Sequence, residues 1–387
     1  MIKTIDECFF QIQNGANIKQ GDVDGGFPIT RIETTANDKF NRDRMGYAGI
    51  TDISKYESYV LEDGDLLMSH INSVQYLGRT VLYIKEADET IIHGMNLLRL
   101  KSRRDVINPA YARYCFYGHS FRSKVGNITK KSVNQASFAV KDLKQIKIEV
   151  PSLSEQDQIV KVLDKLQNLI KMRKDELSAL DDLIKARFVE LFGDPVSNSY
   201  GLPEATLPDL GEFGRGVSKH RPRNDIKLLG GKYPLIQTGD VANAGLYITS
   251  YSSTYSELGL KQSKMWDKGT LCITIAANIA KTAILEFDAC FPDSVVGFIA
   301  NERTNNIFVH YWFSFFQAIL ESQAPESAQK NINLKILSEL KVIVPEKRKQ
   351  DQFASFVKLT DKSKVAVQKA LDEAQLLFDS LMQEYFG

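Results

Sequence analysis

One segment occurs twice in this chain, at a constant separation of 194 residues. The stretch VPSLSEQDQI begins at Val150 and returns as VPEKRKQDQF from Val344. Without a gap, the same separation carries Gln135 onto Gln329, Lys147 onto Lys341, Leu177 onto Leu371, Leu183 onto Leu377, Glu190 onto Glu384 and Phe192-Gly193 onto Phe386-Gly387. Chance does not hold a register over nearly sixty residues, so the chain contains a duplication.

Both copies have an apolar heptad, which is typical of a long helix that buries one stripe against another helix. The residues expected to pair the helices are Leu163, Ile170, Leu177, Leu180, Ile184, Leu191, Val357, Val367, Leu371, Phe378, Leu381 and Tyr385. Ser154 with Asp157 forms an imperfect capping box at the start, and Gly193 with Pro195 predicts the end of the first helix. From Ser154 to Leu191 such a helix is a rod of roughly 57 Å. Two such rods pack against each other most simply, and the residues allow either a parallel or an antiparallel pair.

The duplication divides the chain into two globular segments and two helical segments. The expected boundaries are 1–150 for the first globular domain, 151–195 for the first helical spacer, 196–344 for the second domain and 345–387 for the second spacer. Both globular segments have a turn at a glycine, Gly64 or Gly269, followed by a buried strand, a polar loop and another strand. Each also has an aromatic, helix-like stretch that begins near Pro109 or His310 and is expected to lie in the core. The predicted fold class is α+β, with two similar α/β domains joined by two long helices.

Charge is informative only locally, because the net charge of the whole chain is +1. Residues 101–150 contain eleven Lys or Arg against three Asp or Glu, with the densest polar tip at Lys130-Lys131. The second domain opens with GRGVSKHRPRNDIK, where Lys219, His220, Arg221, Arg223 and Lys227 face only Asp225. Basic side chains next to Asn and Gln suit phosphate neutralisation and the reading of base edges. A solvated surface loop is the alternative for either cluster alone, but two clusters on duplicated domains favour DNA.

The sequence offers little for catalysis or for a membrane. Four scattered cysteines without a CxxC pair indicate reduced thiols, and no apolar run is long enough to span a bilayer, so we expect a cytoplasmic protein without a signal peptide. Asn108-Pro109-Ala110-Tyr111 is similar to the base-flipping loop of amino-methyltransferases but lacks its second proline, and a helix start is the favoured interpretation. No Walker A motif is present, and the five histidines lack metal-ligand spacing. The chain is therefore expected to be non-catalytic.

Two variable domains, each followed by Pro-x(4)-Gln-Asp-Gln and a heptad helix that ends in Phe-Gly, resemble the specificity (S) subunit of type I restriction-modification systems. The resemblance covers the whole chain and is strongest from Val150 to Ile159. The second copy departs from it at Lys349, where the first copy has Glu155.

The resemblance implies that the helices pair antiparallel and that each target recognition domain reads one half of a split, asymmetric sequence in double-stranded DNA. The helices would set the gap, and the rod length exceeds one duplex turn of roughly 34–36 Å. Two methyltransferase (M) subunits and the restriction/translocase (R) subunits are the implied partners in a prokaryotic cytoplasm. S-adenosylmethionine, ATP and Mg²⁺ would belong to those partners, and this chain would hold no cofactor and no metal.

The candidate DNA-binding residues lie on matching loops of the two domains. In the first domain they are Arg42, Arg44, His70, Asn72, Gln75, Arg79, Lys130, Lys131 and Asn134, and in the second Lys219, His220, Arg221, Arg223, Asn278, Lys281, Lys330 and Asn331. Two other functions stay open at this point. One is a scaffold whose rods join two protein-binding domains, and the other is an independent DNA methyltransferase. Steep loss of DNA affinity with salt separates a DNA reader from a scaffold, and binding of S-adenosylmethionine by the isolated chain would identify a methyltransferase.

Overall fold

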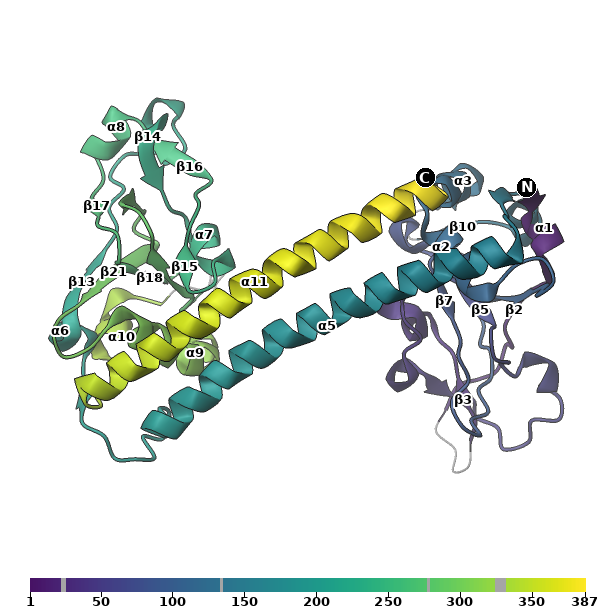
Figure 1. Cartoon of the computed structure of the whole chain (residues 1–387), viewed down its shortest axis with the longest axis horizontal. Coiled ribbons are helices and arrows are strands. Elements are labelled where there is room, and N and C mark those ends of the chain that lie inside the picture. The colour runs from purple at the N-terminus through teal and green to yellow at the C-terminus, as the bar shows by residue number, and fades with distance from the viewer. Residues whose placement is uncertain (22–25, 133–134, 277–278, 324–331) are drawn as a thin grey trace. The chain divides into compact units, whose positions relative to one another are not determined.

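The computed structural model describes residues 1–21, 26–132, 135–276, 279–323 and 332–387. It divides into two compact units. Unit 1 comprises Met1–Arg173 with Ala370–Gly387, and unit 2 comprises Lys174–Lys369. Each unit therefore contains one α/β body and one half of each of the two long helices, α5 and α11 (Figure 1).

The long helices are copies of each other in length and position. Helix α5 spans Leu153–Phe192 and α11 spans Lys347–Phe386, and both have 40 residues. The capping box of α5 lies two residues earlier than the sequence predicted. Glu155 accepts from Ser152 N at 2.9 Å and Glu155 N donates to Ser152 Oγ at 3.3 Å, so Ser152 is the capping residue and the prediction of Ser154 with Asp157 is wrong. Gly193, with a φ of 76°, ends α5 in the left-handed region that glycine tolerates best.

The two helices run antiparallel within each unit. In unit 1, Leu163 near the start of α5 shares a buried cluster with Phe386 at the end of α11. In unit 2, Phe188 near the end of α5 packs with Phe353 near the start of α11, with ring centroids 5.3 Å apart. This confirms the antiparallel arrangement that the resemblance implied. All the predicted helix-pairing residues are buried or half-buried.

The body of unit 1 is built on an antiparallel sheet with the order β2-β8-β5-β7. These strands are β2 Phe9–Asn14, β8 Leu97–Ser102, β5 Leu66–Ser69 and β7 Thr80–Leu82. Smaller pairings are β1 Ile2–Thr4 with β11 Lys147–Glu149, β3 Pro28–Ile29 with β4 Gly46–Tyr47, and β6 Ile71–Asn72 with β10 Ala136–Ser137 and β9 Lys130–Lys131. The helices are α1 Ile5–Cys8, α2 Pro109–Tyr117, α3 His119–Ile128 and α4 Val140–Lys144, with 3₁₀ turns η1 Ile32–Asp38, η2 Arg42–Arg44, η3 Glu57–Tyr59 and η4 Val74–Tyr76.

The body of unit 2 repeats this plan with an added sheet. Its main sheet has the order β13-β21-β18-β19-β15, with β13 Gly211–Arg215, β21 Val295–Ala300, β18 Leu271–Thr274, β19 Thr282–Leu285 and β15 Tyr247–Ile248. The second sheet is β16 Ser253–Tyr255, β14 Leu229–Leu235, β20 Ala289–Cys290 and β17 Met265–Trp266, and β12 Glu204–Ala205 pairs with β22 Val342–Ile343. The helices are α6 Leu207–Leu210, α7 Thr238–Asn243, α8 Glu257–Lys261, α9 Asn306–Gln323 and α10 Leu334–Glu339, with η5 Ile226–Leu228.

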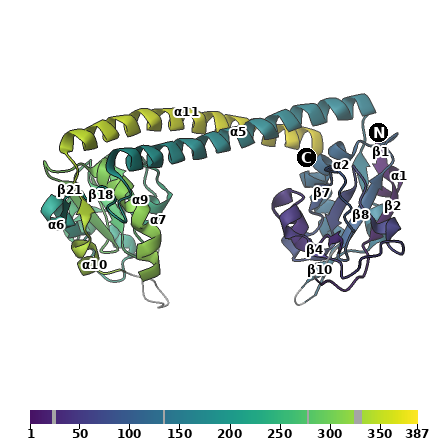
Figure 2. The same cartoon turned by 90° about the horizontal axis from the view of Figure 1, so that it is seen from below.

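Strands β5 and β18 each begin with three apolar residues because both faces of each main sheet are covered. In unit 1, Leu66 and Met68 of β5 face the cluster that contains α2, while Leu67 faces a separate cluster. In unit 2, Leu271 and Ile273 of β18 face α9, while Cys272 faces the other side. Successive side chains of a strand point to opposite faces, so two covered faces require an uninterrupted apolar run. Figure 2 shows α9 between the sheet and the long helices in unit 2.

Candidate nucleic-acid interface

A small three-stranded sheet forms the polar tip of unit 1. Strand β10 pairs with both β6 and β9, so that Ala136 lies opposite Asn72 on one side and opposite Lys131 on the other. Lys130 and Lys131 are exposed. Asn72 is oriented, because its Nδ2 donates to Ser69 Oγ at 3.3 Å and its Oδ1 accepts from Ser73 N at 2.7 Å. The fold thus brings together three predicted DNA-binding residues that lie almost sixty positions apart in the sequence.

Unit 2 repeats the backbone contact that builds this tip. In unit 1, Phe138 N donates to His70 O at 3.3 Å, and in unit 2, Ile332 N donates to Ile275 O at 3.0 Å. The loop after the central strand therefore meets the segment before the long helix in both units. Lys281 lies on this loop, and its backbone N–H donates to Thr274 Oγ1 at 3.1 Å. The other predicted residues of the two tips, Asn134, Asn278, Lys330 and Asn331, lie outside the described residues.

In unit 2 the basic loop comprises residues 214–227. Carboxylates pair with several of its cationic side chains and orient them. Asp293 pairs with both Arg223 and Arg221, at 3.5 Å for Arg221. His220 Nε2 lies 3.1 Å from Asp225, whose pKa is lowered first by the backbone hydrogen bond from Lys227. Lys219, His220, Arg221 and Arg223 all stay exposed.

Asp293 also ties this loop to the tip. The carbonyl oxygen of the next residue, Ser294, accepts from Ile275 N at 3.0 Å, which places the basic loop beside the loop after β18. The cationic side chains and the tip therefore share one end of unit 2.

Several predicted residues of unit 1 are engaged within the protein. Arg42 donates to Glu89 through Nε at 2.8 Å and through Nη2 at 2.6 Å, and this pairing lowers the pKa of Glu89 to about 2. His70 is buried, and loss of hydration lowers its pKa to about 4, so it is neutral at pH 7. Arg44 and Gln75, by contrast, are exposed.

The side chain of Arg79 is partly exposed, and its Nε is fixed by an ion pair. Its Nε lies 2.8 Å from Asp38 Oδ1, and its guanidinium lies 4.7 Å from the centre of the Tyr76 ring. These contacts orient the side chain next to the loop that carries Asn72 and Gln75. Whether any of these side chains touches DNA stays a prediction.

Sequence reasoning missed the first-unit counterpart of the basic loop. After β2, Ala16 N donates to His93 O at 2.8 Å, and after β13, Gly216 N donates to Val295 O at 2.9 Å. Each segment follows the first strand of the main sheet of its unit, so Lys19 lies at a position along the chain that corresponds to the region of Lys219. Lys19 is exposed, and Gln20 next to it accepts from Arg31 Nε. The signal was the similarity of NGANIK at 14–19 to RGVSK at 215–219.

A second missed feature joins each body to a long helix. Gln156 of α5 is fully buried, and its Nε2 donates to Val106 O at 3.0 Å and to Pro151 O at 2.9 Å. Asp157 next to it accepts from Asn108 Nδ2 at 2.8 Å. Asn108 also caps α2, since its Oδ1 accepts from Ala110 N at 2.8 Å. Asn108-Pro109 is thus a helix start, which confirms the favoured interpretation of this motif.

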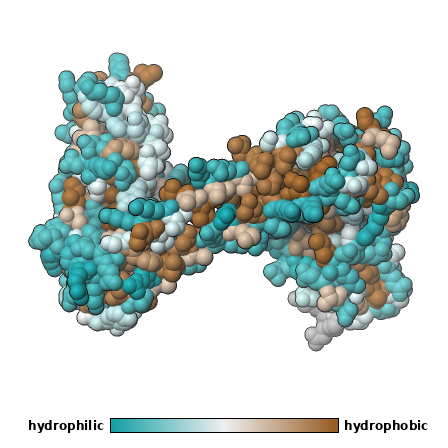
Figure 3. Space-filling model, in the orientation of Figure 1, coloured by the Kyte–Doolittle hydropathy of each residue, from teal (hydrophilic) through white to brown (hydrophobic). Residues whose placement is uncertain are grey.

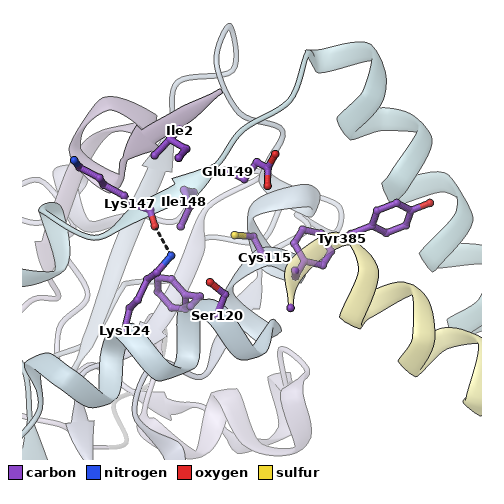
Figure 4. A pocket seen from close by; sticks show the side chains of 11 residues that line it. Ile2, Cys115, Ser120, Lys124, Lys147, Ile148, Glu149 and Tyr385 are labelled. Atoms are coloured by element: carbon purple, nitrogen blue, oxygen red, sulfur yellow. Dashed lines mark hydrogen bonds between the residues drawn. The ribbon is translucent and has the colours of Figure 1, made fainter.

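The end of α11 closes unit 1 over a pocket beside α2 and α3. Phe386 packs on Tyr111, with ring centroids 5.3 Å apart, and Cys115, Ser120 and Tyr385 line the pocket (Figure 4). At its rim Lys124 Nζ donates to Lys147 O at 2.9 Å. Burial raises the pKa of Cys115 to about 12, so the thiol is not a nucleophile at neutral pH. The pocket is a packing gap between elements.

The described part of the chain contains neither a cluster of metal-ligating side chains nor a helix suited to crossing a membrane. There, no three His, Cys, Asp or Glu side chains gather as a metal ion would require. Likewise, no helix within the described ranges is both long and apolar enough to cross a membrane.

Two similar α/β bodies, each with a polar tip and each fixed to antiparallel long helices, define a duplicated recognition fold. A family model described as the type I restriction modification DNA specificity domain matches residues 3–181 and again residues 204–374. The chain therefore belongs to the family of type I restriction-modification specificity subunits and has two recognition domains.

Individual relatives agree with this assignment. The chain is 28% identical over 371 residues to a putative type I restriction enzyme MjaX specificity subunit of Methanocaldococcus jannaschii, a match that covers 93% of this chain and 86% of the relative. It is 23% identical over 229 residues to the EcoKI specificity subunit of Escherichia coli K12, which covers 57% of this chain and 48% of the relative.

Solved structures show the same fold. The S subunit of a type I restriction-modification system from M. genitalium superposes with a TM-score of 0.62 at 15% identity, covering 100% of this chain and 96% of that one. A chain from a structural study of assembly and conformational transition in the type I restriction-modification system gives a TM-score of 0.58 at 14% identity, covering 100% and 97%.

Proposed function

We propose that the chain reads a split sequence in double-stranded DNA, one half with the tip of each unit. The observation that carries this proposal is the repeated contact between the loop after the central strand and the segment before the long helix, which gathers polar and cationic side chains in both units. Ammonium and guanidinium groups neutralise phosphates, while Asn and Gln amides match adenine edges. Two unlike tips, with different side chains on the same scaffold, would read two unlike half-sites.

The long helices are the proposed docking surface for two methyltransferase subunits. Leu183 and Leu377 occupy equivalent positions on α5 and α11, and they are 49% and 50% exposed. Hydrophobic side chains also gather over the unit 1 parts of α5 and α11 in Figure 3, where Leu169, Met172 and Leu376 are exposed as well. An exposed apolar patch on a soluble protein marks an interaction surface. Because equivalent leucines are exposed on both long helices, we expect the same kind of partner to bind at two places.

Under this proposal the chain is not itself catalytic. S-adenosylmethionine would belong to the methyltransferase subunits, and ATP and Mg²⁺ to the restriction/translocase subunits. The complex would work in the prokaryotic cytoplasm, where its DNA substrate lies.

Methylation of the host genome tests the proposal. Methylated adenines are mapped in cells with the gene, without it, and with charge-removing variants of one tip at a time. We expect one split motif to disappear with the gene. Lys130→Ala with Lys131→Ala should weaken or relax one half of the motif, and Lys219→Ala with Arg223→Ala the other half. A methylation pattern that does not respond to loss of the gene would refute the proposal.

A further inference from the structure

A pocket lies in unit 1 where the body meets both long helices. We call it junction pocket 1. Its walls include Asp38 of η1, Arg113 and Tyr114 of α2, Gln167 of α5 and Asp379 of α11, and its volume is about 370 Å³. Arg113 Nη2 donates to Gln167 Oε1 at 2.9 Å, while Arg113 Nε is buried without a hydrogen-bond partner among the described residues.

Unit 2 has a pocket in the corresponding place, junction pocket 2. Its walls include His310 and Tyr311 of α9, Asp181 and Lys185 of α5, Lys364 of α11, and Lys281 from the loop after β18. Its volume is about 310 Å³. Lys364 Nζ lies 2.6 Å from Asp181 Oδ1, and Thr282 Oγ1 lies 2.9 Å from His310 Nδ1.

The two pockets are copies produced by the duplication. Tyr114 and Tyr311 are 197 positions apart, the same separation as Asn108 and Asn305, which both bond to the Asp of the Gln-Asp-Gln motif. Asp379 and Lys185 are 194 positions apart, which is the separation of the two long helices. Both pairs line the pockets, so the same two surfaces of the fold meet in each.

The charge of the pocket is nevertheless inverted between the copies. Junction pocket 1 has two carboxylates, from Asp38 and Asp379, and one guanidinium, from Arg113. Junction pocket 2 has three ammonium groups, from Lys185, Lys281 and Lys364, and one carboxylate, from Asp181. The sharpest difference is at one position, where unit 1 has Asp379 and unit 2 has Lys185.

Each pocket is also linked to the reading tip of its unit through one of its lining residues. Asp38 of junction pocket 1 is the carboxylate that holds Arg79, next to the loop that carries Asn72. Lys281 of junction pocket 2 belongs to the loop after β18, and Thr282 next to it is the first residue of β19. An occupant of either pocket would therefore contact both the helices and the support of the tip.

We propose that the two junction pockets receive the same contact from two copies of the methyltransferase subunit, and that their opposite charge makes the two copies bind with unequal affinity. The inference rests on the proposed function. A duplicated pocket fits a partner that is present twice, and identical partners present identical charges to unlike pockets. Like charges facing each other at an interface oppose binding, so one pocket is filled first.

The test exchanges the two equivalent charges, with Asp379→Lys, Lys185→Asp and the double variant. Both side chains are exposed on helices, so the fold should persist, and thermal unfolding checks this. The full-length chain is titrated with the methyltransferase subunit of its own system at low and high salt, and stoichiometry and affinities are measured. Hydrogen exchange of α2 and α9 reports which unit is occupied first. Asp182→Lys and Glu384→Lys, exposed on the same helices outside the pockets, are the matched controls.

For the wild type we expect two binding steps whose dissociation constants differ by about tenfold at low salt and converge at high salt. Each single exchange should reduce the ratio of the two dissociation constants by about three- to tenfold. The double exchange should restore the difference between them, with the order of filling reversed. Two equal steps that respond to neither exchange would overturn the inference and leave the proposed function standing. No binding of the methyltransferase subunit to any version would overturn both.

Discussion

Gln156 and Gln350 make the same buried contact in the two halves of the chain. Each is fully buried at the start of a long helix, and each donates from Nε2 to two backbone carbonyls, that of the proline five residues earlier and that of a body residue. The side-chain oxygen accepts from Asn108 N in unit 1 and from Thr304 Oγ1 in unit 2, both at 2.8 Å. This contact sets how each helix leaves its body.

Replacement of this glutamine should destabilise the unit in which it lies. Gln156→Ala leaves two carbonyls and the Asn108 N–H buried without partners, which we expect to cost about 2–4 kcal/mol of unfolding free energy. Gln350→Ala should act on unit 2 to a similar extent. Urea unfolding measures both, and Gln158→Ala, at an exposed position, is the control. A stability equal to that of the control would show that the contact is dispensable.

Phenylalanine side chains at the helix ends should hold the bodies that they reach. Phe386 packs on Tyr111 in unit 1, and Phe192 packs on Phe308 in unit 2. Phe386→Ala and Phe192→Ala each remove a buried ring, and we expect a loss of about 3 kcal/mol. Proteolysis should then cut α11 or α5 near its end more readily. Glu384→Ala, at an exposed position of α11, should change neither property, and equal protease resistance in Phe386→Ala would contradict the assignment.

The Arg42–Glu89 pair predicts a dependence of stability on pH. Glu89 has a pKa of about 2 in the fold against an ordinary value of 4.5, mainly because of the hydrogen bonds from Arg42. A depressed pKa stabilises the fold above pH 4.5, and this contribution is lost as the pH falls toward 2. Arg42→Ala should therefore flatten the fall in stability between pH 4.5 and 2. Arg44→Ala, at an exposed position, should keep the wild-type profile, and identical profiles for all three proteins would argue against the pair.

Salt dependence should reveal the phosphate contacts at the tip of unit 1. Lys130→Ala and Lys131→Ala should each weaken DNA binding and reduce the slope of log affinity against log salt by about 0.9 for each phosphate that is no longer neutralised. Fluorescence anisotropy with target duplex, measured on the complex at several salt concentrations, gives this slope. Lys165→Ala, at an exposed site on α5, should leave the slope unchanged. An unaltered slope in both tip variants would remove these lysines from the interface.

The spacing of apolar residues and glycines in the sequence predicted much of the architecture. The heptads predicted helices that the structure places at Leu153–Phe192 and Lys347–Phe386, and the glycines Gly64 and Gly269 marked turns before the two buried central strands. Local signals of this kind depend on residues a few positions apart, which makes them visible in a single sequence. The capping box was placed wrongly because Ser152 and Ser154 both offer a hydroxyl near the helix start.

The sequence by itself determined the duplication, the length of the long helices and the α/β character of both bodies, because these follow from short-range periodicity and a repeated register. Only the tertiary structure decided that the helices run antiparallel, that Arg42 is held by Glu89 and Arg79 by Asp38, and that Asp379 and Lys185 line equivalent pockets with opposite charge. These relationships join residues tens to hundreds of positions apart. Their energies arise only when the chain has closed those distances, so no local pattern encodes them.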